Sequence, residues 1–566
     1  MTFKLSSFFR PKFFDLFTGK EPYSRQLFTS DLIAGMVVGI VALPLAIAFG
    51  IASGVTPQQG IITAIVAGFL ISFFGGSNFL IGGPTGAFIV IVYGIVQQYG
   101  MNGLIIATVL AGVMLIIMGV AKLGTIIKYI PYPIIVGFTG GIAVIIFSTQ
   151  VGDFLGLDIV NQPADFFPKW GAIFGHIGNI DIWTTLLSLL TVAIIIIWPR
   201  FSKKLPGSLV ALVAVTGISL LLAHFAAIEV ATIGTKFPQL AGGVPLPKAE
   251  TPHIDMEAIR RLFQPAFTIA LLCAIESLLA AMVADGVTGK KHNSNTELIG
   301  QGIANIITPL FGGIPATGAI ARTMTNINNG GKSPVSGLIH AAVLLLMFLF
   351  LMPYAVYIPL SCLAGILVVV AYKMSEWRAF RYLLKGDKAD VAVLLVTFGL
   401  TVAIDLTIAI QLGLVLAVIT FLKRVSDTSS IKAVERELFA NENEEAIDPD
   451  VLQIPPGVEV YEINGPFFFG LANKFDDVEH NIPHKKIKIR VIRMRKVPFI
   501  DSTGLNNLRN LWKRSKAHRI QIVLSGVNEQ VRASLERSGF ADELGREFIC
   551  PHISVAMEKV QRMLEN

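Results

Sequence analysis

Long apolar stretches recur along the first 424 residues and are separated by short polar turns. The apolar core of a bilayer is about 30 Å thick and needs about 20 residues per helix. By this measure the chain holds twelve spans, at 32–53, 59–76, 103–121, 131–150, 182–198, 208–227, 266–284, 296–311, 334–353, 356–372, 389–404 and 406–422. Two more apolar stretches, 84–97 and 316–326, are too short to cross the membrane. Interpreted as half-helices with extended lead-ins, they complete fourteen segments of an α-helical polytopic membrane protein.

The two short stretches share their surroundings. The sequence FFGG at 73–76 precedes PTGA at 84–87, and LFGG at 310–313 precedes ATGA at 316–319. Because seven segments, an odd number, separate the copies, the second copy is inverted in the membrane. Inverted repeats with broken helices at matching positions are typical of secondary transporters. Gly and Pro are also common punctuation in membrane helices, but the matched order of the two copies favours a repeat.

The pattern also divides the chain into domains. Residues 1–30 form an N-terminal segment, and residues 31–424 form the transport domain. Its first repeat covers about 31–228 and its second about 265–424. Residues 425–450 are charged and indicate a linker. Residues 451–566 alternate strand patterns (458–463, 488–494, 521–524) with helical ones (503–517, 528–538), which predicts a small cytosolic α/β domain.

Composition and charge support a membrane location. Only 15% of residues are charged, against about 25% in soluble domains, and residues 32–121 contain none. With the N-terminus in the cytoplasm, most loop cations fall on the cytoplasmic side, as the positive-inside rule requires: Lys122, Lys128, Arg200, Lys203, Lys204, Lys290, Lys291, Lys373 and Lys423. Arg260 and Arg261 are the exception. We therefore expect a multi-pass protein of the inner cell membrane in contact with lipid, with both termini cytoplasmic.

Other function classes lack signals in the sequence. Three scattered cysteines form no metal-binding or redox pattern, and no catalytic or nucleotide-binding motif is complete. The excess of basic residues lies in membrane-flanking loops, which argues against a nucleic-acid partner. We therefore expect no enzyme activity, no catalytic residue, no metal and no cofactor.

The two Thr–Gly clusters indicate an internal binding site. Thr85 and Thr317 are good N-cap residues, so each half-helix is expected to begin there and direct its free amides at the membrane midplane. A helix N-terminus carries about +0.5 of an elementary charge and binds anions. Arg322 would raise the total for two such ends to about +2, which predicts an anion site. Alternatively, Arg322 extends to the membrane interface and binds lipid phosphate.

Glu276 is the second charged residue within a span, about 15 Å deep at 1.5 Å per residue. An isolated ionised carboxylate is costly there, so we expect it to take up a proton when the anion binds. Proton and anion would then move together. The alternative is a permanent structural ion pair between Glu276 and Arg322.

Several motifs together resemble the SulP (sulfate permease) anion transporters: DLIAG at 31–35, ALP at 42–44, GPTG at 83–86, IES at 275–277, residues 295–305 and residues 312–322. The sequence FIDSTGL at 499–505 resembles the signature loop of a STAS domain. The resemblance implies seven plus seven inverted segments divided into core and gate domains, an elevator-like movement and a homodimer. It also implies a substrate among sulfate, bicarbonate, chloride, oxalate and C4-dicarboxylates.

The resemblance assigns roles to single residues. It places the substrate at Thr85, Gly86, Ala87 and Phe88 of one half-helix and at Thr317, Gly318, Ala319, Ala321 and Arg322 of the other. It gives Glu276 the acidic coupling position. Sodium-coupled members carry a hydroxyl residue one turn later, where this chain has Ala280, so a proton is preferred over sodium. Leu45 stands where several members have Gln.

Ser502 and Thr503 match the STAS-loop position that is phosphorylated in bacterial regulatory relatives. The alternative is an unmodified turn capped by Asp501. For the whole chain, the first hypothesis is a proton-coupled anion symporter. The second is an anion exchanger or uncoupled conductor on the same fold, and the third is a membrane sensor that signals through its C-terminal domain.

Overall fold

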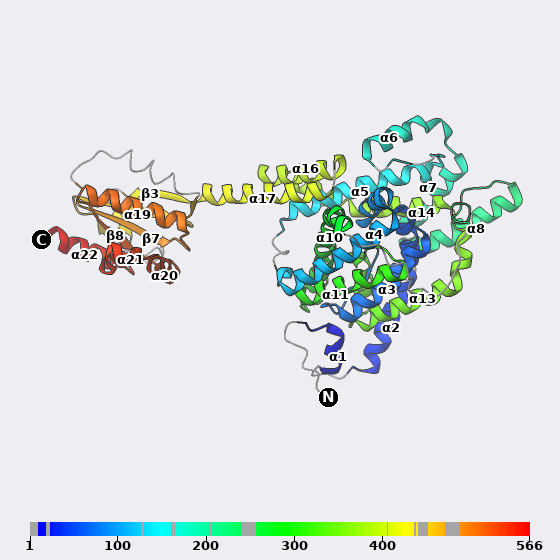
Figure 1. Ribbon diagram of the computed structural model, residues 1–566, viewed down its shortest axis with the longest axis horizontal. Coiled ribbons are helices and arrows are strands. Elements are labelled where there is room, and N and C mark those ends of the chain that lie inside the picture. Colours follow the sequence, from blue (N-terminus) through cyan, green and yellow to red (C-terminus); the bar gives the residue numbers. More distant parts are fainter. Residues whose placement is uncertain are drawn as a thin grey trace. The chain divides into compact units, whose positions relative to one another are not determined.

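The structure is a computed structural model that describes residues 9–18, 23–125, 130–159, 162–163, 165–202, 206–238, 256–404, 406–434, 437–439, 451–469 and 487–565 (Figure 1). It consists of two compact units, Met1–Val415 and Leu416–Asn566. Lys128, Lys203 and Lys204, which support the predicted orientation, lie outside the described residues. Each unit is described by itself below.

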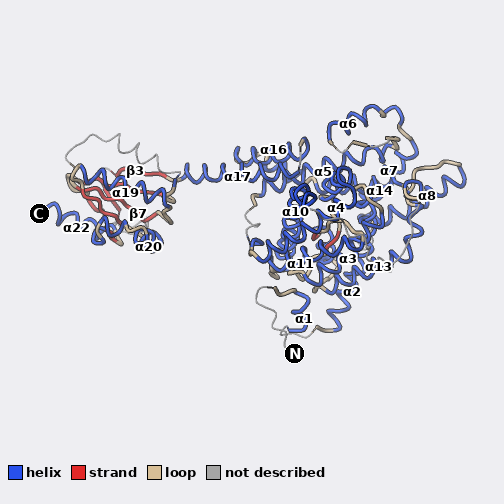
Figure 2. The backbone as a smooth tube through the Cα atoms, viewed as in Figure 1, coloured by secondary structure: helices blue, strands red, loops and turns tan. Residues whose placement is uncertain are grey.

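The first unit is built of helices, as Figure 2 shows. Ten helices in the described part of the chain are long and apolar enough to span a membrane, and the last of them continues into the second unit. They are α2 (Arg25–Ala52), α3 (Pro57–Phe74), α4 (Phe88–Val120), α5 (Tyr132–Leu155), α7 (Ile182–Ile197), α8 (Gly207–Ala226), α10 (Met256–Thr288), α13 (Val335–Leu351), α14 (Leu360–Met374) and α17 (Leu406–Thr428). Shorter helices are α1 (Asp15–Thr18), α6 (Phe166–Gly175), α9 (Ile233–Lys236), α11 (Ser294–Ile307), α12 (Ile320–Asn328), α15 (Trp377–Leu383) and α16 (Lys388–Ala403).

The helix α4 contains two of the predicted segments. Gly100 interrupts it with φ 68° and ψ −174°, a backbone conformation that glycine adopts without steric cost. The first part corresponds to the predicted half-helix 84–97 and the second to the span 103–121. When α4 is counted as two segments, the helices match the fourteen predicted segments, and most of the predicted ends agree within a few residues.

The helices form two groups by their contacts. In one group, α4 packs against α10 and α11, and α2 packs against α3, α12 and α13. In the other, α5 packs against α14 and α16, and α7 packs against α8 and α14. Gly112 of α4 and Gly302 of α11 allow close approach, because a Cβ on either would lie within 2.7 Å of the other's carbonyl oxygen. We call the first the core group and the second the gate group, after the two domains that the resemblance implies.

Two short strands, one from each repeat, pair inside the core group, and we call this pair the crossing. β1 (Gly82–Gly83) pairs antiparallel with β2 (Thr317–Gly318), in the register Gly82 opposite Gly318 and Gly83 opposite Thr317. These strands directly precede α4 and α12. The extended lead-ins of the two predicted half-helices therefore meet, although residues 84–316 separate them in the chain.

The second unit contains a five-stranded sheet in the order β3-β6-β7-β8-β9. The strands are β3 (Ser430–Val434), β6 (Val458–Asn464), β7 (Ile489–Lys496), β8 (Gln521–Ser525) and β9 (Ile549–Cys550). β3 is antiparallel to β6, and the other pairs are parallel. A separate pair consists of β4 (Glu437–Phe439) and β5 (Val451–Gln453).

Helices cover both faces of this sheet, because its strands alternate apolar side chains between the two sides. Ile492 and Leu524 face α19 (Ser502–Ala517), α20 (Glu529–Arg537) and α21 (Phe540–Leu544). Val491 and Val523 face α22 (Ile553–Glu565). β3 lies within 425–450, where the sequence predicts a linker. The segment has only five residues (SIKAV), too few to show a strand pattern. Of that range, residues 435–436 and 440–450 lie outside the described residues.

Candidate functional site

The strands β1 and β2 are held by polar side chains from neighbouring helices. The side chain of Asn305 donates to the Ala316 carbonyl (2.9 Å) and accepts from the Ala316 amide (2.9 Å). Thr63 accepts from the Ile314 amide at 2.8 Å. Non-helical backbone within a membrane requires such partners, because no water is available to replace them. Asn305, one of the polar residues of 295–305, thus supports the backbone that leads into β2.

Thr85 and Glu276 meet beside this crossing. The Thr85 hydroxyl donates a 2.8 Å hydrogen bond to the Glu276 carboxylate. Both residues are partly exposed, whereas Gly86, Ala87 and Ser277 around them are buried. A hydroxyl and a carboxylate from opposite repeats therefore share one accessible position in an apolar interior.

Thr317, the counterpart of Thr85, is fully buried and has different partners. Its hydroxyl donates to the Cys273 carbonyl at 3.0 Å and lies 2.8 Å from the Ser277 hydroxyl. The Ser277 hydroxyl also accepts from the Gly318 amide at 2.9 Å. Thr317 and Gly318 thus attach β2 to α10, the helix that carries Glu276.

Arg322 lies beneath the crossing with 1% of its surface exposed. Its guanidinium donates to the carbonyls of Pro84 (2.8 Å) and Gly82 (3.4 Å), so it joins α12 to the other repeat. Gly83 must lack a side chain here, because a Cβ would lie 2.2 Å from Arg322 Nη1. This burial contradicts the alternative in which Arg322 reaches lipid phosphate at the interface. Among the described residues, no ion pair joins Arg322 to Glu276, so the permanent-pair alternative is also wrong.

The predicted N-caps differ from the observed helix starts. α4 begins at Phe88 after Ala87, and α12 begins at Ile320 after Ala319. The predicted capping by Thr85 and Thr317 is wrong, because both hydroxyls bind α10 instead. The first turn of α12 is accessible: Ile320 is 41% exposed and Ala321 is exposed.

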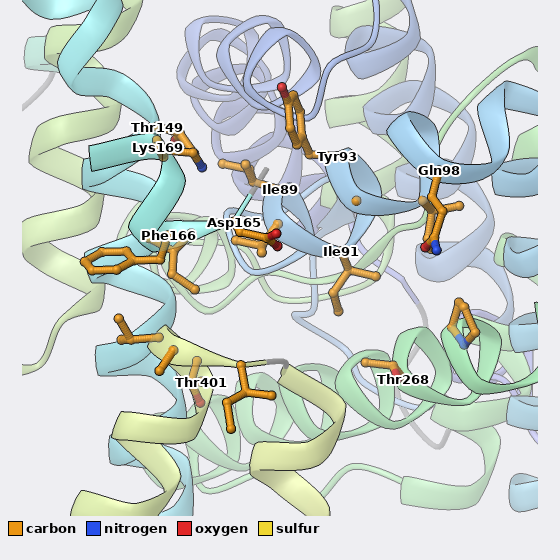
Figure 3. A pocket seen from close by; sticks show the side chains of 18 of the residues that line it. Ile89, Ile91, Tyr93, Gln98, Thr149, Asp165, Phe166, Lys169, Thr268 and Thr401 are labelled. Atoms are coloured by element: carbon orange, nitrogen blue, oxygen red, sulfur yellow. The ribbon is translucent and has the colours of Figure 1, made fainter. Parts of the chain in front are cut away.

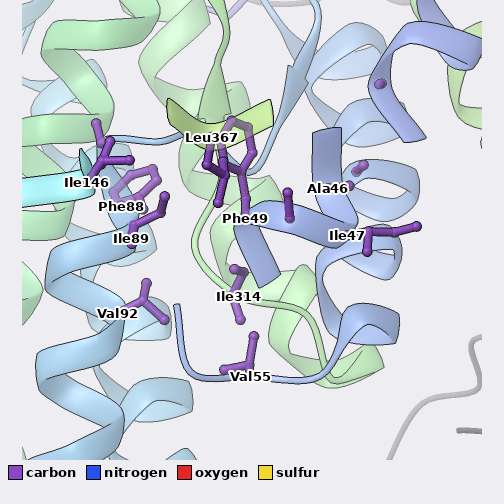
Figure 4. Close-up of a cluster of buried hydrophobic side chains, with 14 of the residues drawn as sticks. Ala46, Ile47, Phe49, Val55, Phe88, Ile89, Val92, Ile146, Ile314 and Leu367 are labelled. Carbon is purple, nitrogen blue, oxygen red and sulfur yellow. The ribbon is translucent and has the colours of Figure 1, made fainter. Parts of the chain in front are cut away.

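Apolar side chains from the core and gate groups close over the start of α4 (Figure 4). A Cβ on Gly86 would lie 2.9 Å from Met374 Sδ of α14 and 3.2 Å from Ile146 Cδ1 of α5. We call the following buried cluster the apolar seal: Phe49, Phe88, Ile89, Ile146 and Leu367. Phe88, one of the expected substrate contacts, belongs to it and is 1% exposed.

A cavity of about 630 Å³ lies beside the seal (Figure 3). Its lining comes from α4, α5, α6, α10 and α16 and includes Ile89 of the seal, but it does not include Thr85 or Glu276. Sequence reasoning missed this cavity and its buried lysine, Lys169. A lysine between membrane spans is ordinarily exposed, so only the aromatic run around it, FFPKW at 166–170, hinted at burial.

In the second unit, Ser502 and Thr503 are exposed at the start of α19. Asp501 caps this helix by accepting from the Gly504 amide at 2.7 Å. The capped turn is therefore present, and the two hydroxyls are accessible.

Comparison with known proteins gives two family matches. The profile of the sulfate permease family matches residues 28–397, and that of the STAS domain matches residues 451–556. YvdB of Bacillus subtilis, which carries a sulfate-transporter name, is 42% identical over 539 residues, covering 95% of this chain and 98% of YvdB. The bicarbonate transporter BicA of Picosynechococcus is 32% identical over 530 residues, covering 90% of each chain.

Solved structures of transporters also match the chain. The transmembrane domain of a cyanobacterial BicA has 32% identity and a TM-score of 0.61, covering 70% of this chain and 98% of that one. Murine solute carrier 26 family member A9, an anion transporter solved in the inward-facing state, has a TM-score of 0.83 at 17% identity and covers 99% of this chain and 96% of its own. At that identity the likeness shows a shared fold.

Proposed function

The chain belongs to the sulfate permease family, and we propose that it is a secondary active transporter that moves a small anion together with a proton. The observation that carries the proposal is the contact between Thr85 and Glu276 beside the crossing strands. The sulfate and bicarbonate transporter names of its relatives support these anions as candidates, and a C4-dicarboxylate is a third.

The charge distribution supports an anion as substrate. α4 and α12 both begin directly after the paired strands, so the positive ends of two helix dipoles lie near the crossing. Arg322 adds a buried cation whose guanidinium is bonded to the β1 backbone. The exposed first turn at Ile320 and Ala321 leaves backbone amides of α12 accessible to a ligand. We assign the substrate to Thr85–Phe88 on one side and Thr317–Arg322 on the other.

Glu276 supports coupling to protons. Its carboxylate accepts from a neutral hydroxyl, and no described cation lies within ion-pairing distance. Its negative charge therefore opposes the charge of an incoming anion, and protonation removes this repulsion. Ala280, one turn later, offers no oxygen to a sodium ion. An anion exchanger or uncoupled conductor on the same fold remains the alternative.

The division of the helices into two groups supports an elevator-like movement. Gly86 of the core contacts Met374 and Ile146 of the gate through apolar surfaces, which can slide without breaking hydrogen bonds. We place the protein in the inner cell membrane as a homodimer, with the N-terminus and the STAS domain in the cytoplasm. The STAS domain would then regulate transport, and the chain would have no enzyme activity.

Flux into proteoliposomes tests this proposal. Purified protein is supplied with radiolabelled sulfate, bicarbonate or fumarate while a trapped dye reports the internal pH. Symport acidifies the lumen as the anion enters, exchange requires an anion inside, an uncoupled conductor moves no protons, and a sensor moves nothing. Glu276→Gln keeps the hydrogen-bond acceptor for Thr85 but cannot take up a proton. We expect it to abolish acidification; unchanged acidification and accumulation would refute the role of Glu276.

A further inference from the structure

The cavity beside the seal forms a chamber in front of the proposed transport site. We call it the outer vestibule, because α6 lies in the loop between α5 and α7 that the proposed orientation places outside the cell. Polar side chains from five helices line it: Tyr93, Gln98, Thr149, Lys169, Thr268 and Thr401. Ile89 of the apolar seal lies at its inner boundary. An anion that enters from outside would therefore meet these residues first.

Lys169 is the unusual member of this lining. Its side chain extends from α6 with only 2% of its surface exposed, and its ammonium lies 6.0 Å from the centre of the Tyr93 ring (Figure 3). Two contacts fix this geometry. The Trp170 indole donates to the Ser148 hydroxyl of α5 at 3.0 Å, and the Tyr93 hydroxyl donates to the Gln162 carbonyl at 2.9 Å.

The charge of Lys169 is not neutralised by the described residues. Asp165 is the one carboxylate of the lining, and it forms no ion pair with Lys169. Arg261, the other cation of the lining, is paired with Glu257. A buried ammonium without a counter-charge is costly. Burial lowers the pKa of Lys169 to about 8, and the charge of Asp165 partly opposes this shift.

We propose that the outer vestibule is a second anion site, in which Lys169 holds a small oxyanion before it passes the apolar seal. The inference rests on the proposed transport function and names a further site on the same path. A polar chamber with a buried, unpaired cation suits a partly hydrated oxyanion, because the ammonium supplies the charge and the side-chain amide of Gln98 can donate a hydrogen bond. The alternative is a lysine buried only to pack α6 against Tyr93.

The affinity of this site for an anion is expected to fall as the pH rises. Below about pH 8 the Lys169 ammonium is charged and attracts an anion, and above it this charge is lost. The other ionisable groups of the lining are Asp165, Arg261, Tyr93 and Tyr99. Of the groups in this lining, Lys169 is the one whose pKa burial brings to about 8, so its charge is expected to change with pH near neutrality.

Charge-selective labelling tests the site without relying on transport. Thr149→Cys places a thiol on the lining, and its reaction rates with an anionic and a cationic methanethiosulfonate reagent are compared in the full-length protein. Thiol ionisation and accessibility affect both rates, so taking the ratio of the two rates removes their contribution. The described native cysteines, Cys273, Cys362 and Cys550, are buried, and protein without Thr149→Cys gives the background.

We expect Lys169→Met to lower the anionic-to-cationic ratio about tenfold, since it removes one positive charge close to both probes. Sulfate should slow the anionic reagent in the parent and not in Lys169→Met. The matched control is Lys236→Met, which removes a lysine paired with Asp153 outside the vestibule lining and should leave the ratio unchanged. An unchanged ratio in Lys169→Met, or equal protection by sulfate, would overturn the proposal.

Lys169→Arg gives a second, independent readout. Arginine stays charged at all relevant pH values, so the anionic-to-cationic ratio of Lys169→Arg should be constant from pH 7 to 9. The ratio of the parent should fall as the pH rises through about 8. A parallel fall in both proteins would also overturn the assignment. Anion flux by the Thr149→Cys protein is measured separately. Absent flux with an intact charge-dependent ratio would refute the transport function and not the site.

Discussion

The hydroxyl of Thr85, which precedes the first broken helix, donates a 2.8 Å hydrogen bond to Glu276 in the opposite repeat. Thr85→Val keeps the shape of the residue and removes this donor. A hydrogen bond to a charged group contributes about 1.5–3 kcal/mol, so we expect kcat/KM for the anion to fall by about tenfold or more. Initial uptake rates across a range of anion concentrations measure this change.

Thr85→Ser is the matched control, because it keeps the hydroxyl and removes one methyl group. It should retain most of the parent activity. If Thr85→Ser and Thr85→Val lose activity equally, shape and not the hydrogen bond at Thr85 is what transport requires.

Arg322 combines a positive charge with a bracing role, since it donates to the carbonyls of Gly82 and Pro84. Arg322→Lys keeps the charge but lacks the planar fork, whereas Arg322→Gln loses the charge as well. We expect both to lower the unfolding temperature by similar amounts. Anion affinity, measured by calorimetry with sulfate or bicarbonate, should fall about tenfold further in Arg322→Gln. Equal affinities in the two variants would indicate that Arg322 acts only as a brace.

Gly86 marks the contact between the core and gate groups, where Met374 Sδ would lie 2.9 Å from an added Cβ. Gly86→Val should therefore obstruct the sliding of the core and lower the maximal uptake rate by about tenfold. Gly217→Val, in α8 with no atom within 4 Å of its would-be Cβ, is the control for a valine at an uncrowded glycine. The double variant Gly86→Val with Met374→Ala should recover part of the rate, and no recovery would place the obstruction elsewhere.

The apolar pattern predicted the spans well because the bilayer imposes a length on every helix, whatever its neighbours. It also predicted the two breaks, since both Thr–Gly clusters interrupt otherwise continuous apolar sequence. It could not predict that Thr85 and Thr317 bind α10 and do not cap their own helices. Capping is a local rule, and the competing partners Glu276 and Cys273 lie about 190 and 44 residues away in the chain.

Contacts that depend on how distant segments pack could not be predicted from the sequence either. Arg322 was expected at the substrate, and its bonds to Gly82 and Pro84 depend on how the repeats cross, which one repeat alone does not encode. The burial of Lys169 could not be predicted from the sequence, because it arises from the docking of α6 through Trp170 and Ser148. β3 was missed since a five-residue strand gains its stability from pairing with β6.

A last prediction concerns whether a negative charge at the STAS loop stabilises or destabilises the helix that follows. Ser502 is exposed at the first position of α19, where the helix dipole favours a negative charge. Ser502→Asp, which mimics phosphorylation, should therefore stabilise α19 by about 0.3–1 kcal/mol. Ser538 lies at the C-terminal end of α20, so Ser538→Asp should destabilise that helix by a similar amount. Hydrogen–deuterium exchange of the amides of α19 and α20 in the full-length protein measures both changes. If Ser502→Asp speeds exchange in α19, a phosphate at this loop would act by unfolding the helix and not by adding a charged surface to an intact domain.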